Sequence, residues 1–298
     1  MHIGMIGLGR MGGNMRSRIE AAGHEVTGYD ANPAVSEVPS LAALAEALPA
    51  EGRVVWVMVP AGDPTLSVLR ELAEVLSPGD LVIDGGNSYY KADATNAAML
   101  AERGIDYVDA GVSGGIWGRD NGYGLMVGGS DEAVARVMPI FDALRPEGPR
   151  EEGFVHAGPV GAGHFVKMVH NGIEYGQMQA YAEGYEIIAS RTDLVPDTTA
   201  VFRAWQRGTV VRSWLLELLV DALEEDPALE SISDYTADSG EGRWTLEEAI
   251  DNAVPAPTLS AALFARFASR QEYSPAMKAV AALRQEFGGH TVRPILED

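Results

Sequence analysis

The stretch His2-Ile3-Gly4-Met5-Ile6-Gly7-Leu8-Gly9-Arg10-Met11-Gly12 combines a short apolar run with the pattern G-x-G-x-x-G. A helical pattern follows to Ala22, and a second strand-like run, Glu25 to Tyr29, leads to Asp30, eighteen residues after Gly12. In such a unit the first glycine permits a tight turn, the second lets the backbone approach a pyrophosphate, and the third lets helix and strand pack closely. The helix N-terminus then holds the anion. The stretch therefore predicts a dinucleotide-binding unit rather than a glycine turn of another α/β protein.

The same stretch contains the residues that we expect to contact the cofactor. They are Gly7, Leu8, Gly9, Arg10, Met11, Gly12 and Asp30. A carboxylate at the end of the second strand accepts hydrogen bonds from the adenosine ribose diol and repels a 2′-phosphate. The next three residues, Ala31-Asn32-Pro33, include no arginine that would bind such a phosphate. We therefore expect NAD rather than NADP, and a higher kcat/KM with NADP would contradict this.

Strand-like and helical patterns continue to alternate through the N-terminal half. Strand patterns cover 53–59, 80–84, 106–110 and 125–127, and helical patterns cover 64–76, 92–103 and 131–144. This order is typical of an α/β fold with a doubly wound, Rossmann-type sheet, in which ligands bind at the carboxyl ends of the strands. The segments at those ends are Val59-Pro60-Ala61, Asp84-Gly85-Gly86-Asn87-Ser88 and Val112-Ser113-Gly114-Gly115. Glycine-rich loops can be plain turns, but three of them beside a cofactor favour a binding site.

The pattern changes after residues 154–157. From residue 161 onward it is nearly all helical, over 161–191, 197–207, 212–224, 246–253, 258–270 and 275–287. We therefore expect an NAD-binding domain over residues 1–159 and an all-α domain over residues 160–298. A chain of 298 residues is long enough for two such domains.

The helix expected over 161–191 carries an unusual set of polar side chains. Lys167, Asn171 and Glu174 stand at i, i+4 and i+7, so they share one helix face. His170 is one turn from both Lys167 and Glu174. The alternative is an exposed Lys/Glu pair on a solvated helix, because such pairs are common and weak. The small and apolar residues around Lys167 argue against full exposure, so we interpret the face as a base and an acid held on one rigid element.

Composition excludes several classes of function. The chain has no cysteine, so disulfides and thiolate metal sites are excluded. Its formal net charge of −21 argues against nucleic acid or an anionic membrane as a partner. The apolar runs are too short to cross a bilayer, and there is no signal-peptide pattern, so we expect a soluble cytoplasmic protein. With three lysines among 22 basic residues, we also hypothesise a high-salt cytosol, which loss of activity in molar salt would contradict. A merely acidic protein is the alternative.

These parts suit the oxidation of a secondary alcohol. That reaction needs a base for the hydroxyl proton and a cofactor that takes the hydride. A lysine can be the base where burial or a nearby cation lowers its pKa. A carboxyl group whose pKa is raised by desolvation can supply a proton later in the reaction.

The motifs together resemble one known family. The dinucleotide pattern, Asp84-Gly85-Gly86-Asn87-Ser88, Gly111-Val112-Ser113-Gly114-Gly115 and the block Gly161–Gly176 are similar to those of decarboxylating 6-phosphogluconate dehydrogenases, and the chain length suits the family's shorter bacterial and archaeal branch. The resemblance covers almost the whole chain. The wider β-hydroxyacid dehydrogenase superfamily shares the dinucleotide pattern, the Ser-Gly-Gly loop and the lysine, but generally lacks the run His170-Asn171-Gly172-Ile173-Glu174-Tyr175.

The resemblance implies a reaction and a role for each matched residue. Lys167 would take the C3 hydroxyl proton while hydride leaves for NAD, and would then stabilise the enediolate oxygen after carbon dioxide leaves, with no metal. Glu174 would protonate C1 to give ribulose 5-phosphate, in the oxidative branch of the pentose phosphate pathway. Val59, Pro60, Ala61 and Asn87 would contact the cofactor. The substrate residues would be Asn87, Ser113, Gly114, Gly115, His170, Asn171 and Tyr175.

Further matches concern the substrate phosphate. Arg266 aligns with the family's phosphate-binding arginine, and Arg284 and His290 match its Arg-x5-His tail, which in the family comes from a neighbouring subunit. The resemblance therefore implies a homodimer or homotetramer. One run departs from the family's Lys-Gly-Thr-Gly-Lys-Trp, because this chain has Ser239-Gly240-Glu241-Gly242-Arg243-Trp244. The usual lysine and threonine are missing, so the 6-phosphate site is expected to rest on Arg266, Arg284, His290 and Tyr175.

Two other functions stay open. The departure at Ser239 and Glu241 favours a dehydrogenase of an unphosphorylated aldonate or small 3-hydroxy acid, whereas Arg266 and the tail oppose it. The second alternative is a non-catalytic NAD-binding regulator on the same fold. Lys167 and Glu174 oppose this, because a regulator needs no acid and base on one helix face.

Overall fold

The computed structural model describes residues 1–293, and the chain forms two compact units, Met1–Asn171 and Gly172–Asp298. The units meet within one long helix, α7 (Ala162–Ala189), which contributes turns to both. The boundary expected after residue 159 stays a prediction. Each unit is described separately below.

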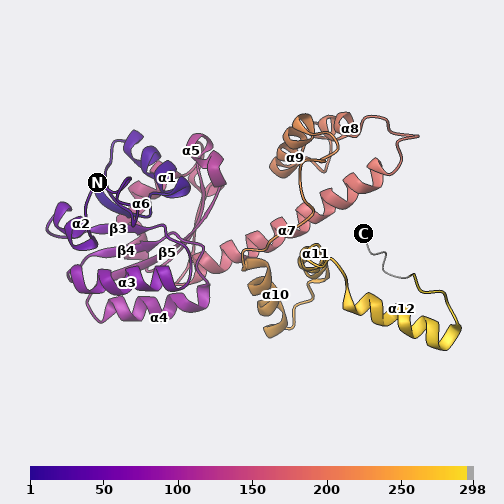
Figure 1. Cartoon of the computed structure of the whole chain (residues 1–298). Coiled ribbons are helices and arrows are strands. Elements are labelled where there is room, and N and C mark those ends of the chain that lie inside the picture. Colours follow the sequence, from indigo (N-terminus) through magenta and orange to yellow (C-terminus); the bar gives the residue numbers. More distant parts are fainter. Residues whose placement is uncertain (294–298) are drawn as a thin grey trace. The chain divides into compact units, whose positions relative to one another are not determined.

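The first unit contains a seven-stranded sheet in the order β2-β1-β3-β4-β5-β6-β7 (Figure 1). Its strands are β1 (His2–Ile6), β2 (Glu25–Tyr29), β3 (Val54–Val57), β4 (Leu81–Asp84), β5 (Asp106–Ser113), β6 (Gly124–Gly128) and β7 (Phe154–Gly158). Strands β1 to β5 run parallel, β6 pairs antiparallel with β5, and β7 runs parallel to β6. The strand order reverses between β1 and β3, which is where doubly wound sheets bind ligands. The expected doubly wound α/β fold is confirmed.

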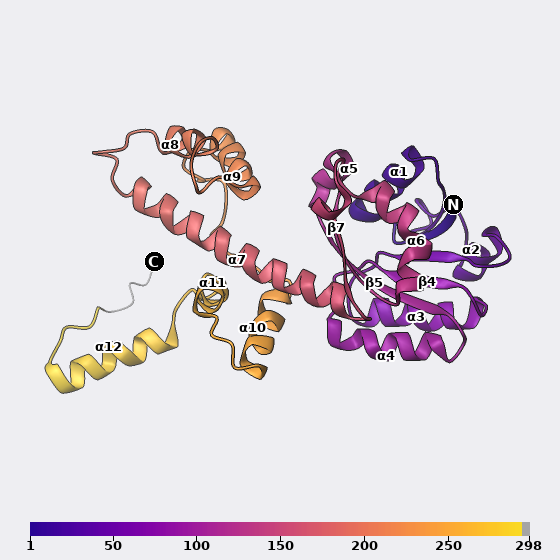
Figure 2. The same ribbon diagram turned by 180° about the vertical axis from the view of Figure 1, so that it is seen from behind.

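Helices cover both faces of this sheet (Figures 1 and 2). They are α1 (Arg10–Ala21), α2 (Leu41–Ala47), α3 (Asp63–Val75), α4 (Tyr90–Ala101), α5 (Gly118–Asn121) and α6 (Asp131–Leu144), with short 3-10 turns at Gly115–Trp117 and Arg150–Glu152. One apolar core joins α1 and α6 to the sheet, and the other joins α2, α3 and α4 to its opposite face. Consecutive buried residues such as Val54 to Val57 fit a sheet covered on both sides.

Helix α2 is absent from the sequence-based expectation. It is only seven residues long and alanine-rich, so its periodicity is weak. Its start is nevertheless encoded, because the Ser40 side chain accepts a hydrogen bond from the Ala43 N–H. Leu41 and Leu44 then face the core.

The second unit is helical. Besides the later turns of α7 it contains α8 (Thr198–Trp205), α9 (Trp214–Glu225), α10 (Glu241–Asp251), α11 (Pro257–Ala268) and α12 (Pro275–Gly288). Phe202, Leu216 and Leu223 form one core, and Tyr175 and Leu263 belong to another. Helix α10 begins five residues before the expected Leu246. The run that departs from the family pattern therefore supplies its first turn.

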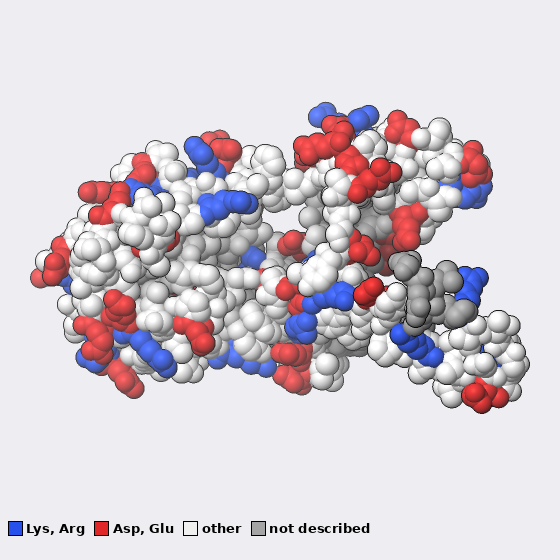
Figure 3. Space-filling model, in the orientation of Figure 1, with Lys and Arg blue, Asp and Glu red and all other residues white. Residues whose placement is uncertain are grey.

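Carboxylate side chains are spread over the visible surface of each unit, and basic side chains are interspersed among them (Figure 3). This agrees with the net charge of −21. Among residues 1–293, no helix is both long and apolar enough to span a membrane.

Candidate active site

The turn after β1 has the geometry that a pyrophosphate requires. Gly7 has φ +90°, and a Cβ there would lie 2.4 Å from the Met58 carbonyl oxygen. A Cβ at Gly12 would lie 1.9 Å from the Gly7 oxygen, so only glycine lets α1 start so close to the strand. Gly9 differs, because a Cβ there would meet no atom within 4 Å. Gly7 and Gly12 thus fix the fold, whereas Gly9 leaves open space beside the N-terminus of α1, and these residues fit a dinucleotide.

Asp30 follows β2 and faces this turn. Its Oδ2 accepts the Leu8 N–H at 2.7 Å, and its Oδ1 accepts the Asn32 N–H at 2.8 Å. The carboxylate is therefore fixed beside the second residue of the glycine turn. On the neighbouring helix, Arg16 forms ion pairs with Glu20 and Glu37. Arg16, unlike the exposed Arg10 of the turn itself, is thus already neutralised by two carboxylates.

The segments after β3 and β4 lie against the same turn. A Cβ on Gly7 would lie 3.2 Å from Val59 Cγ1, and one on Gly86 would lie 3.2 Å from the Val59 oxygen. Pro60 accepts a hydrogen bond from Thr65 Oγ1 at 2.9 Å, and Pro60 and Ala61 are exposed. The structure therefore gathers the predicted cofactor segment 59–61 and the loop 85–88, which holds Asn87, at one edge of the sheet.

Helix α7 approaches this sheet at its first two turns. A Cβ on Gly163 would lie 2.5 Å from the Met126 oxygen, and one on Gly111 of β5 would lie 2.3 Å from Lys167 Cβ. Glycine at both positions is what allows helix and strands to touch. Lys167 therefore lies on a turn of α7 that packs directly against β5 near the carboxyl end of the strand.

The polar residues predicted at this point form one hydrogen-bonded chain. The Lys167 Nζ donates to Asn171 Oδ1 at 2.6 Å, and His170 Nδ1 lies 3.1 Å from the same oxygen. Ser113 Oγ lies 3.3 Å from His170 Nε2. An amide oxygen can only accept, so Nδ1 of His170 carries a proton. All four side chains are partly buried, which disagrees with a fully solvated helix face.

The other residues of the predicted loop after β5 adopt a turn. Gly114 has φ +134° and Gly115 has φ +54°, and both values favour glycine. The Asn14 amide of α1 donates to the Ile116 oxygen at 3.3 Å, which ties the turn to the glycine-rich helix start. Ser113 thus lies beside His170, and the turn that follows it, with Gly114 and Gly115, is tied to α1 through Ile116.

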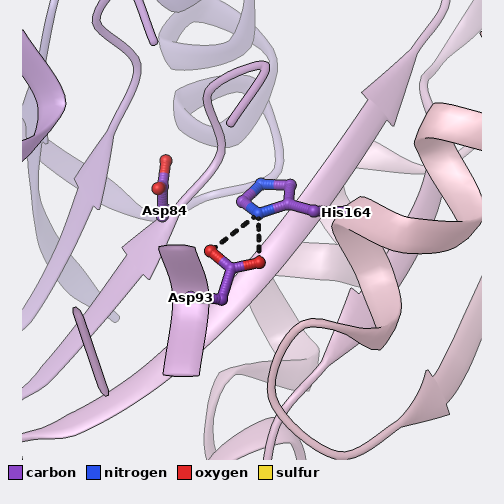
Figure 4. A group of neighbouring side chains, drawn as sticks. All are labelled: Asp84, Asp93 and His164. Carbon is purple, nitrogen blue, oxygen red and sulfur yellow. Dashed lines mark hydrogen bonds and ion pairs between the residues drawn. The ribbon is translucent and has the colours of Figure 1, made fainter. Parts of the chain in front are cut away.

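A buried polar group that sequence reasoning missed lies next to this site (Figure 4). Asp84, Asp93 and His164 come from β4, α4 and α7. One atom of each side chain that could bind a metal ion lies within 4.8 Å of the other two. His164 Nδ1 lies 2.9 Å from Asp93 Oδ2 and 3.1 Å from Oδ1. Tyr107 Oη lies 2.9 Å from Asp93 Oδ1 and 3.2 Å from Asp84 Oδ2. Because these contacts engage the atoms a cation would use, we interpret the group as a hydrogen-bonded network.

Burial and charge act in opposite directions on this network. Burial disfavours the His164 imidazolium, but the hydrogen bond and charge of Asp93, with the charges of Asp84 and Asp109, outweigh it and raise the pKa of His164 to about 9. Burial raises the pKa of the Asp93 carboxyl, although His164 opposes the change. Burial, with Asp84 and Asp93, raises the pKa of the Tyr107 hydroxyl. The network therefore holds a charged imidazole and a protonated phenol at neutral pH.

In the second unit, Arg266 and Tyr175 of the predicted phosphate site lie together, and the backbone before and at the start of α10 contacts them. The Arg266 guanidinium carbon lies 3.5 Å from the centre of the Tyr175 ring, and Arg266 Nη1 donates to the Ala237 oxygen at 3.1 Å. The Tyr175 Oη accepts the Ser239 N–H at 3.2 Å. Gly242 lets α10 reach the same ring, since a Cβ there would lie 2.5 Å from Tyr175 Cε2. Glu174 precedes Tyr175 on α7 and is half-buried.

Arg243 does not replace the missing lysine in this structure. Its Nε donates to Asp238 Oδ2 at 2.6 Å and its Nη2 to Oδ1 at 3.1 Å, and Arg270 Nη2 donates to the same Oδ1. The hydrogen bond from Arg243, with that from Arg270, lowers the pKa of Asp238 to about 2. Glu241 is buried at the start of α10. The run 239–244, which departs from the family pattern, thus forms the start of α10, where Arg243 is paired with Asp238.

The tail residues lie at and beyond the end of α12. Helix α12 has no buried residue, and Arg284 and His290 are exposed. Within residues 1–293, neither side chain forms a hydrogen bond or ring contact with Tyr175 or Arg266. Their predicted role in a neighbouring subunit's site stays a prediction.

The fold and the first-unit site define a dinucleotide-binding oxidoreductase with a helical second unit. Residues 2–146 match the family described as the NAD binding domain of 6-phosphogluconate dehydrogenase, and residues 163–291 match its C-terminal domain. The chain belongs to the 6-phosphogluconate dehydrogenase family.

Named relatives agree with this assignment. The YqeC protein of Bacillus subtilis is 42% identical over 97% of this chain and 98% of its own length. A protein of Haloferax volcanii named 6-phosphogluconate dehydrogenase, NAD(+)-dependent, decarboxylating, is 40% identical over 98% of both chains. The solved 6-phosphogluconate dehydrogenase of Plasmodium falciparum, described with NADP+ and with 6-phosphogluconate, has a TM-score of 0.75 at 27% identity, covering 100% of this chain and 67% of that one.

Proposed function

We propose that this protein catalyses the NAD-dependent oxidative decarboxylation of 6-phosphogluconate to ribulose 5-phosphate and carbon dioxide. The observation that carries the proposal is the hydrogen-bonded row of side chains Lys167, Asn171, His170 and Ser113. Lys167 packs against Gly111, at the carboxyl ends of the strands, where the dinucleotide turn also lies. It supplies an amine, an imidazole and a hydroxyl where a polyhydroxy acid would lie. The relatives' names support the same reaction.

The nicotinamide cofactor, when bound, accepts hydride from C3 of the substrate. Lys167 takes the C3 hydroxyl proton as the carbonyl forms. The resulting 3-keto acid loses its carboxylate as carbon dioxide, and the protonated amine of Lys167 stabilises the oxygen on which negative charge collects. Glu174, two helical turns further along α7, delivers a proton to the carbon that carried the carboxylate, which becomes C1 of ribulose 5-phosphate. Lys167 then loses the proton that it took and Glu174 regains the one that it gave, through exchange with solvent, so that each turnover yields one reduced cofactor and one carbon dioxide.

NAD is the proposed cofactor, and the environment of Asp30 supports this choice. Its carboxylate is fixed by the Leu8 and Asn32 amides beside the turn, where it favours a ribose diol and opposes a 2′-phosphate. Arg16, a neighbouring cation, is engaged by Glu20 and Glu37. An NADP-preferring site needs a cation that is available to the phosphate.

For the substrate phosphate we propose Arg266 and Tyr175, joined by Arg284 and His290 from a neighbouring copy of the chain in a homodimer or homotetramer. The pairing of Arg243 with Asp238 and the burial of Glu241 favour a second candidate, an unphosphorylated aldonate. Both candidates use the same base and cofactor.

The test is NADH formation from 6-phosphogluconate and from gluconate, measured side by side with carbon dioxide release and repeated with NADP. A strong preference for the phosphorylated acid and for NAD, with one carbon dioxide per NADH, is the expected result. Preference for gluconate, or NADH without carbon dioxide, would leave the family assignment standing and refute the proposed substrate.

A further inference from the structure

The buried network beside the site connects the loop 85–88 with the start of α7. The proposed reaction needs these two segments in a fixed position relative to each other. Asp84 ends β4, where its Oδ1 accepts the Gly86 N–H at 3.0 Å and its Oδ2 accepts the Ser88 hydroxyl at 2.8 Å. These two bonds fold the loop that presents Asn87. Asp84 and Ser88 are both buried, so the loop is fixed from its protein side.

At its other end the network holds the start of α7. The backbone N–H groups of Gly161, just before α7, and of His164, in its first turn, donate to the Asp109 carboxylate at 2.7 and 2.9 Å. The His164 side chain then pairs with Asp93 at 2.9 Å. Lys167 follows His164 by three residues, one turn along the same helix.

Tyr107 joins the two ends. Its hydroxyl stands between Asp93 and Asp84, so one phenolic proton is shared by the carboxylate that binds α7 and the one that folds the 85–88 loop. Figure 4 shows the two aspartates, Asp84 and Asp93, and the imidazole of His164 close together, each on a different element. The path from loop to helix thus runs Ser88, Asp84, Tyr107, Asp93, His164 without a gap.

We propose that Asp84, Tyr107, Asp93 and His164 form a positioning network that fixes the Lys167 turn of α7 relative to the loop carrying Asn87. These residues do not touch substrate; they act through Lys167 and Asn87. The inference rests on the proposed function for its kinetic consequence, because the lysine and the loop must hold one substrate between them. Its physical reason is that small displacements of reacting groups cost up to about a hundredfold in rate.

Burying several charged side chains costs free energy, so stability alone does not explain this network. The network places three carboxylates, Asp84, Asp93 and Asp109, around one imidazole, and all four side chains are buried. Buried ion pairs are often no more stabilising than apolar residues of the same volume. His164 Nε2 has no hydrogen-bond partner among the residues described, which adds to the cost. Fixing a base against a loop is a function that an apolar cluster could not perform by directed bonds.

The test uses His164→Gln, Asp93→Asn and Tyr107→Phe, with His156→Gln as the matched control. His156 is half-buried, whereas His164 is buried, and the His156 Nε2 lies 3.0 Å from the Gly129 oxygen, so it is a hydrogen-bonded histidine outside the network. Tyr107→Phe removes a single oxygen and protects the test against loss of folding. For each variant, kcat, KM and NAD affinity are measured per folded molecule, with amide hydrogen exchange of residues 84–90 and 161–168.

We expect kcat with 6-phosphogluconate to fall about tenfold to a hundredfold in the three network variants, with NAD affinity reduced less than kcat, because only Asn87 among the expected cofactor residues lies on the loosened loop. Both segments should exchange faster, whereas α1 should not, and the control should match the native protein. Rescue is also expected, because His164→Gln keeps a side-chain N–H for Asp93 and should lose less activity than His164→Leu. Folded variants with native kcat and native exchange would overturn the proposal.

The kinetic and exchange measurements separate two failures. A native protein inactive on 6-phosphogluconate and gluconate would refute the proposed function, while faster exchange confined to the two segments would still support the network. Native activity together with unchanged exchange in Tyr107→Phe and His164→Gln would refute the network alone. Equal loosening of α1 and of the two segments would show a merely structural role and also refute it.

Discussion

The Lys167 Nζ lies 2.6 Å from Asn171 Oδ1, one helical turn away on α7. His170 Nδ1 shares the same acceptor, so one amide oxygen aligns the amine and the imidazole. This hydrogen bond gives the amine of the partly buried Lys167 a defined direction. It is the arrangement on which a base role for Lys167 depends.

Replacing Lys167 by methionine should abolish turnover while leaving cofactor binding intact. Loss of a general base costs about 10²- to 10⁴-fold, and the dinucleotide turn does not use this side chain. Lys278→Met is the control, because Lys278 lies on exposed α12. The measurement is kcat together with NAD affinity by fluorescence. Full activity in Lys167→Met would refute the mechanism, and loss of NAD binding would show that the variant is not specific to chemistry.

Gly111→Ala should damage catalysis through crowding rather than chemistry. The added Cβ would lie 2.3 Å from Lys167 Cβ and 3.1 Å from the Gly163 oxygen, so the lysine turn must move away from β5. We expect kcat to fall at least tenfold and the melting temperature to drop. Gly124→Ala is the matched change, because its Cβ would meet only Ser113 Cβ, at 4.0 Å. Equal behaviour of the two variants would contradict the close approach of α7 to the sheet.

The glycines of the dinucleotide turn should separate binding from folding. Gly9→Ala meets no protein atom, so it should fold normally and raise the KM for NAD by filling the space that a pyrophosphate needs. Gly12→Ala clashes with the Gly7 oxygen at 1.9 Å, so it should lower the melting temperature as well. The pair is compared by thermal unfolding with and without NAD. A native KM in Gly9→Ala would refute the predicted cofactor position.

Local patterns predicted the sheet, the glycine turn and the lysine helix, because each is encoded by spacing within one segment. The residues of the buried network were not predictable in this way. Asp93, Tyr107 and His164 stand far apart in sequence and meet only when α4, β5 and α7 pack together. The pairing of Arg243 with Asp238 was missed for a related reason, since the early start of α10 sets its direction.

Stability should fall in alkaline solution through His164. Its pKa rises from 6.5 to about 9 on folding, so the native state binds a proton more tightly than the unfolded state. The stabilisation is complete below about pH 6.5 and is lost as pH rises through about 9. The free energy of unfolding, measured with urea from pH 6 to 10, should decline in the native protein and decline less in His164→Gln. Parallel curves for the two proteins would contradict the raised pKa, and His156→Gln should follow the native curve.

Arg266 should discriminate between the two candidate substrates. Its guanidinium is held over the Tyr175 ring and by the Ala237 oxygen, which leaves a positive charge in a fixed place with no carboxylate bonded to it among the residues described. Arg243 is a contrasting cation, because Asp238 already neutralises it. If Arg266 binds a phosphate, Arg266→Met should raise the KM for 6-phosphogluconate about 10- to 100-fold and leave the KM for gluconate unchanged, since charge-assisted hydrogen bonds contribute about 1.5–3 kcal/mol. Arg243→Met should alter neither value strongly. Equal effects of Arg266→Met on both substrates would assign the arginine to the packing of α7 against α11, and would favour the unphosphorylated acid as the substrate.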